Sequence, residues 1–196
     1  MVLSVGVCAE ETGLRRFHAR FYVTFLQGTS LSGFSHGTKR DFIPTPDGGQ
    51  EVISARFVHP SEALRVNRSR GMTFMPPQYY LISTLAEILS GNRNDEAQRE
   101  RVRQLSEGVF GRMVVVPRQL KLEDGRVALV YGGDELVDGP VGARHRSTVK
   151  PGPGGVSLIA FVFGIFADAG QVPTEIDLQR NIDVFTKRVT MRYVKL

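Results

Sequence analysis

Apolar residues recur at three- and four-residue spacing after Pro76-Pro77, which predicts an amphipathic helix in this part of the chain. A shorter helix is expected to start at His59-Pro60, because proline suits the first helical position. The apolar stripe of the longer helix consists of Tyr80, Leu81, Leu85, Ile88 and Leu89.

Runs rich in aromatic and β-branched residues predict strands. Two of them, Phe17–Leu26 and Glu51–Val58, flank a segment of Gly, Ser, Thr and Pro that is typical of a loop. Two shorter runs, Val114–Val116 and Ala128–Tyr131, are separated by Glu123-Asp124-Gly125, so we expect a hairpin there.

Three further segments complete the pattern. Ser4–Leu14 is interpreted as the end of a helix, with Gly13 at a left-handed C-cap. Asn92–Glu107 is strongly charged and predicts an exposed helix. Gly132–Gly155 is rich in glycine and polar residues, which favours a loop or flexible link. Its Arg144-His145-Arg146 run has two interpretations: a solvated loop, or a segment that closes over an anion.

The elements in this order predict an α/β fold, with residues 1–90 as one portion and residues 91–196 as a β-leaning extension carrying a charged helix, a hairpin and a Gly-rich loop. With 41% hydrophobic and 23% charged residues, the chain can bury a core. The net charge of +5 permits an anionic partner without requiring one. The apolar run 156–167 is too short to span a membrane, and a single cysteine suits a reducing, intracellular location.

The first chemically suggestive feature is the adjacent carboxylate pair Glu10-Glu11, followed by Thr12-Gly13-Leu14. Adjacent glutamates are most often a solvated helix face. The spacing Glu-Glu-x-Gly-apolar also matches the closing positions of the Nudix box. There, carboxylates at i, i+3 and i+4 project from one helical face and can hold Mg²⁺ against a diphosphate.

Later segments follow the same series. A strand, Arg16–Tyr22, comes directly after the pair; Glu51 opens a strand leading into Ala55-Arg56-Phe57 and Pro60-Ser61-Glu62-Ala63-Leu64; and Pro76-Pro77-Gln78 opens a helix. In this order the segments resemble the coenzyme A diphosphatase branch of the Nudix hydrolases, especially its fungal members. Phe110-Gly111-Arg112-Met113 and the stretch from Thr174 to Asn181 are similar to the C-terminal extension of those members.

The resemblance implies the later part of a Nudix mixed sheet flanked by helices, and Mg²⁺- or Mn²⁺-dependent attack of water on a diphosphate linkage. The implied substrate is a small nucleoside-diphosphate derivative, coenzyme A or an acyl-coenzyme A. Glu10 and Glu11 would be the catalytic and metal-binding residues. Arg65, Arg68 and Arg70 are candidates for contacting the substrate phosphates, although a solvated basic surface is the alternative.

Two departures from the family pattern alter these expectations. Val7 occupies the position of the first carboxylate of the triad, and the earlier box positions fall before Met1, so we expect impaired hydrolysis. Residues 156–171 interrupt a connection that is short in the family, and we interpret them as translated intron sequence. The alternatives are a catalytically inactive Nudix-like binding protein and a basic nucleic-acid-binding protein with chance motif matches; we expect no nucleic-acid partner.

Overall fold

A computed structural model describes residues 58–91, 95–115, 117–150 and 175–186 with their side chains, and residues 2–7 and 17–22 as backbone. The chain divides into two compact units, one formed by Met1–Val23 with Pro60–Leu196 and the other by Thr24–His59. Every helix and strand given below lies in the first unit. The described part is a mixed α/β structure, as the sequence predicts.

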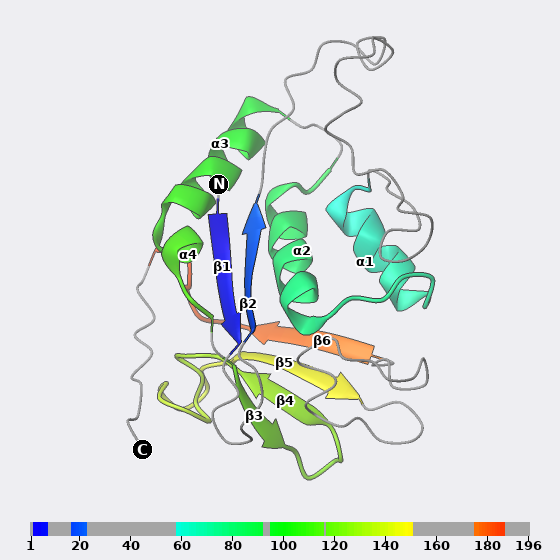
Figure 1. The fold of residues 1–196 in the computed structure, drawn as a ribbon, viewed down its shortest axis with the longest axis vertical. Helices are drawn as coiled ribbons and strands as arrows, with labels where there is room; N and C mark the ends of the chain where they lie inside the picture. Colours follow the sequence, from blue (N-terminus) through cyan, green and yellow to red (C-terminus); the bar gives the residue numbers. More distant parts are fainter. Residues whose placement is uncertain are drawn as a thin grey trace. The chain divides into compact units, whose positions relative to one another are not determined.

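The described strands form a four-stranded sheet and a separate two-stranded pair. In the larger sheet, neighbouring strands are antiparallel and follow each other in chain order, as Figure 1 shows. Its strands are β3 (Arg118–Lys121), β4 (Val127–Val130), β5 (His145–Lys150) and β6 (Glu175–Arg180). The pairing of Lys150 with Glu175 brings the two ends of the intervening connection to adjacent positions of the sheet.

The two-stranded pair corrects one prediction and confirms part of another. β1 (Val2–Val7) pairs antiparallel with β2 (Phe17–Tyr22), so the helix expected over Ser4–Leu14 is wrong for residues 4–7. Valine alternates with smaller or polar residues there, a pattern that suits a strand. The strand expected at Phe17–Leu26 is confirmed for β2, and residues 51–57 of the other expected strand lie outside the described residues.

The helix predicted from Pro60 and the helix predicted from the apolar stripe after Pro76-Pro77 are both present. α1 (Pro60–Arg68) begins at its proline, and α2 (Pro76–Ile88) begins at Pro76, with the backbone N–H of Met75 donating to the Gln78 side chain. α1 ends in a Schellman turn, in which the N–H of Gly71 donates to Val66. Arg70 occupies the left-handed position of that turn, with φ of 62°.

The charged segment forms α3 (Glu96–Glu107), capped by the Asp95 carboxylate, and a single turn α4 (Val109–Arg112) follows it. The prediction of a charged helix is confirmed. The helix is not exposed all round, because Val102 and Leu105 are buried.

The hairpin is confirmed with a shifted first strand. Its turn lies at Glu123-Asp124-Gly125, and Gly125 adopts φ of 78°. The first strand is Arg118–Lys121, whereas Val114 and Val115 of the expected strand lie outside the sheet, where Val115 packs in the core. Residue 116 lies outside the described residues.

The prediction of a continuous loop over Gly132–Gly155 is wrong for residues 145–150. These residues form β5, which pairs on both of its edges and whose first five residues are buried. The residues preceding β5, from Gly132 onward, form the connection from β4, and its polar contacts are described below.

One hydrophobic cluster unites the helices with the sheet. It draws residues from both sides of residue 90, so α2 packs with the elements that follow it. Its buried members are Tyr80, Ile88, Val102, Leu105, Phe110, Met113, Val115, Leu129, Tyr131, Val149 and Val184.

Candidate functional site

The carboxylates that the sequence singles out, Glu10 and Glu11, lie outside the described residues. Val7, which takes the place of their third partner, ends strand β1. An extended residue 7 does not share a helical face with residues 10 and 11, as the Nudix arrangement requires. Within the described part of the chain, no group of three or more His, Cys, Asp or Glu side chains is placed to hold a metal ion.

The three arginines predicted to contact phosphate have different surroundings. Arg65 is paired with Glu62, which accepts from its Nε at 2.7 Å and from its Nη2 at 2.5 Å. The hydrogen bond from Arg65 holds the pKa of the Glu62 carboxyl below its usual value. Arg70 is exposed at the left-handed turn. Arg68 is exposed, and its side chain makes no ion pair or hydrogen bond to the described residues.

Arg68 lines a cavity of about 360 Å³ between α1, α2 and β6, within the size range of small-molecule sites. The structure therefore brings one of the three arginines to a cavity. The other lining residues are Leu64, Tyr79, Ser83, Ala86, Glu87, Asp177 and Leu178.

Arg180 contacts Glu87, an acidic residue in the lining of this cavity. Its guanidinium donates to Thr84 Oγ1 and to Glu87 Oε2, both at 2.8 Å. It also lies 5.3 Å from the ring centre of Tyr80 and 4.9 Å from that of Phe185, within cation–π range. The Arg180 side chain is only 6% exposed, so these contacts anchor Arg180, and its hydrogen bond to Glu87 restrains that exposed carboxylate.

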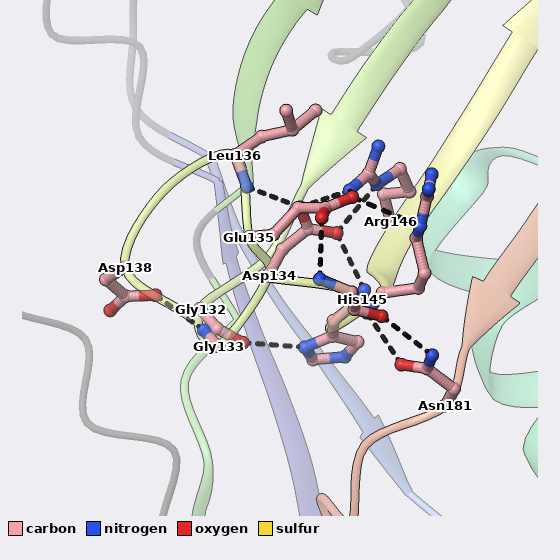
Figure 2. Close-up of polar contacts among 11 residues, drawn as sticks. Gly132, Gly133, Asp134, Glu135, Leu136, Asp138, His145, Arg146 and Asn181 are labelled. Atoms are coloured by element: carbon pink, nitrogen blue, oxygen red, sulfur yellow. Dashed lines mark hydrogen bonds and ion pairs between the residues drawn. The ribbon is translucent and has the colours of Figure 1, made fainter. Parts of the chain in front are cut away.

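A second polar cluster, shown in Figure 2, organises the connection between β4 and β5. The fully buried Asp134 carboxylate accepts from Arg146 Nε at 2.7 Å and from Arg146 Nη2 at 2.6 Å. It also accepts the backbone N–H groups of His145 and Leu136. Burial alone would raise the pKa of Asp134, but these hydrogen bonds outweigh burial and keep the pKa low.

Neighbouring residues complete the cluster. Glu135 accepts from Arg146 and from the N–H of Gly142, while Arg144 pairs with it at 3.2 Å. Asn181, just after β6, accepts the N–H of Arg144 and donates to the carbonyl of Gly142. The Arg144-His145-Arg146 run therefore does not form an open anion site, because its charges are already neutralised by residues of this cluster.

His145 is buried beside this cluster and links it to α2. Its Nδ1 lies 2.8 Å from the carbonyl oxygen of Gly132, and its Nε2 lies 2.9 Å from the hydroxyl of Tyr80. A carbonyl only accepts, so Nδ1 carries the proton, Nε2 accepts, and Tyr80 donates. Burial lowers the pKa of His145 and raises that of Tyr80, which keeps both groups neutral.

Chemically, the two regions differ. In the Asp134 cluster the Asp134 carboxylate and the Arg146 guanidinium are buried and hydrogen-bonded to each other, which suits a structural role. The cavity is lined by Arg68, whose side chain has no acidic partner among the described residues, by the exposed Asp177, and by Glu87, which is exposed but paired with Arg180, so the cavity is the better binding site. Sequence reasoning missed the cluster, since no local pattern marks Asp134 and Arg146 as partners, and it missed Glu87 and Asp177, which only the fold brings together.

Comparisons with protein-family models, with curated proteins and with solved structures found no match to this chain. Within the described residues, no helix combines the length and the apolar character needed to cross a bilayer.

Proposed function

We propose that this chain is a Nudix-type protein directed at the diphosphate linkage of a nucleoside-diphosphate derivative, with coenzyme A or an acyl-coenzyme A as the implied compound. The observation that carries the proposal is the ordered series of motifs from Glu10-Glu11 through Pro60–Leu64 to Pro76-Pro77-Gln78. Helices α1 and α2 begin where this series calls for helices, which supports it.

The phosphate contact is best supported at Arg68. Arg65 is neutralised by Glu62, whereas Arg68 has no acidic partner among the described residues and lines a cavity. An unpaired guanidinium can donate two parallel hydrogen bonds to a phosphate, which gives it geometric selectivity as well as charge.

Hydrolysis by this chain is expected to be slight or absent. A divalent cation at a Nudix box needs carboxylates that share one helical face, and the chain offers Glu10 and Glu11 but a valine in a strand at position 7. The residues present do not complete the ligand set for Mg²⁺ or Mn²⁺, so we assign this chain no metal-assisted step.

The second candidate function is a Nudix-like binding or interaction protein that has lost catalysis. The strand conformation of Val7 favours this candidate, because the Nudix box requires position 7 to lie on a helix.

The test combines binding with turnover. Binding of coenzyme A is measured by calorimetry, and release of nucleotide is followed by chromatography with and without Mg²⁺. We expect saturable binding and negligible release by the wild-type chain. Because residue 7 lies in strand β1, Val7→Glu should leave Mg²⁺-dependent release negligible, and Val5→Glu is the matched control for adding a carboxylate to β1.

The outcomes separate the two candidates. Release by Val7→Glu that Glu10→Gln abolishes supports the hydrolase, whereas binding without release in every variant supports the binding protein. Steady Mg²⁺-dependent release by the wild-type chain would overturn the expected impairment, and absence of both binding and release would overturn the diphosphate proposal.

A further inference from the structure

The cavity between α1, α2 and β6 carries opposite charges contributed by different elements. Arg68 comes from the last turn of α1, Glu87 from the last turns of α2, and Asp177 from β6. A site with one sign of charge would suit a simple anion or cation. This one suits a molecule that carries both.

At the cationic end, Arg68 is free to take a ligand. Its side chain is exposed and, in the part of the chain that the structure describes, forms no ion pair or hydrogen bond. A planar guanidinium with free donors matches a phosphate, which accepts two of its hydrogen bonds side by side.

At the acidic end, the two carboxylates retain capacity to accept hydrogen bonds. Glu87 Oε2 accepts from Arg180 at 2.8 Å, and Asp177 accepts from the Gln179 amide at 3.2 Å. Each carboxylate has about four lone-pair sites, so most of them remain open. The anchored Arg180 fixes the position of Glu87 before any ligand arrives, which lowers the ordering cost of binding.

We propose that this cavity binds a small phosphorylated amine, with its phosphate on Arg68 and its ammonium group against Glu87 and Asp177. An ammonium group is favoured over a hydroxyl because it supplies three donors and a charge opposite to that of Asp177, which accepts only from the neutral Gln179 amide. Glu87 is already paired with Arg180, so it contributes open acceptor sites rather than an uncompensated charge. The apolar side chains of Leu64 and Leu178 would contact the carbon chain between the two ends. The proposal goes beyond the Nudix-type function and requires neither hydrolysis nor a metal.

The experiment is calorimetric titration of the full chain, without divalent cations, using O-phosphoethanolamine as the probe. Ethanolamine and inorganic phosphate test each half alone, and glycerol 3-phosphate replaces the ammonium with hydroxyls. We expect O-phosphoethanolamine to bind at least tenfold more tightly than either half and than glycerol 3-phosphate.

Single substitutions locate the site. Arg68→Ala and Asp177→Asn should each weaken binding of O-phosphoethanolamine roughly tenfold, as expected for loss of a charge-assisted contact. Both positions are exposed, so folding should survive, which circular dichroism checks. Arg101→Ala on α3 and Glu123→Gln in the β3–β4 turn remove matched exposed charges away from the cavity and should leave binding unchanged.

Several results would overturn the proposal. They are the absence of saturable binding of O-phosphoethanolamine, equal binding of glycerol 3-phosphate, and equal effects of the cavity and control substitutions. The Nudix-type proposal is tested separately with coenzyme A, so either proposal can fail while the other stands.

Discussion

The buried pair of Asp134 and Arg146 gives the sharpest test of the structure, through the substitution Asp134→Ala. The two side chains are 0% and 6% exposed, so water cannot replace the lost carboxylate. Removing one partner of a buried ion pair typically costs about 3–5 kcal/mol, because the other charge is left uncompensated.

Local contacts adjust this figure in both directions. Glu135 still accepts from Arg146 Nη2 at 3.0 Å, so the cost of losing the pair itself should be about 3 kcal/mol, the lower end of that range. Asp134 also accepts the N–H groups of His145 and Leu136. The His145 N–H is buried and adds about 1–3 kcal/mol when it is left unpaired, whereas the Leu136 N–H is only partly buried. We therefore expect Asp134→Ala to lower the free energy of unfolding by about 4–6 kcal/mol.

The assay is equilibrium unfolding in urea followed by far-ultraviolet circular dichroism, since the chain has no tryptophan. Glu62→Ala is the matched control, because Glu62 forms the same two-point contact with Arg65 on an exposed helix face. Exposed pairs contribute about 0–1 kcal/mol, so the control should change little. If Asp134→Ala costs no more than Glu62→Ala, the buried arrangement of the pair is wrong.

Three further predictions follow from other features. The folded pKa of His145 lies below its ordinary 6.5, so the unfolded chain takes up protons first as the pH falls. The free energy of unfolding should therefore decrease from about pH 7 to pH 5, and His145→Gln should flatten this slope; an equal slope in both proteins would contradict it. Arg70→Gly should raise the thermal midpoint, corresponding to about 0.5–1 kcal/mol, because glycine adopts φ of 62° without strain. Arg68→Gly, within the helix, should lower the midpoint, and the same sign for both would refute the turn assignment. Deleting residues 156–171 should preserve the sheet and stabilise it by about 1 kcal/mol, since the β5–β6 connection becomes roughly threefold shorter. Loss of the β-sheet signal in circular dichroism on this deletion would show that the sheet needs the removed residues.

The sequence predicts elements that carry their own local signal. α1 and α2 begin at prolines and α2 has an apolar stripe, while the β3–β4 hairpin is marked by Gly125 in its turn. These features act within a few residues, so periodicity and turn chemistry are enough to find them.

β5 was missed for the opposite reason. It begins His-Arg-Ser-Thr, and polar residues normally indicate a solvated segment. They are buried because Asp134 neutralises Arg146, Tyr131 lies 2.9 Å from Ser147, and Tyr80 donates to His145. Partners supplied by other elements cannot be inferred from the composition of β5 itself.

The residues that line the candidate cavity show the same contrast between a local sequence signal and a tertiary contact. Arg68 could be singled out as a cation near a helix end, whereas Glu87 and Asp177 meet it only after β6 pairs with β5 and Arg180 contacts α2. Arg68 could thus be named as a candidate from the sequence, whereas Glu87 and Asp177 could be named only from the tertiary structure.

The sheet order also bears on edge-to-edge pairing between copies of this chain. β3 is an outer strand of the four-stranded sheet, and outer strands can recruit strands from other molecules. β3 has only four residues, is largely exposed, and carries Arg118 and Lys121 at its two ends. Two such strands approaching edge to edge would bring like charges together over a short ladder. The polar composition that made β3 hard to find from the sequence therefore disfavours edge-to-edge pairing at this side of the sheet.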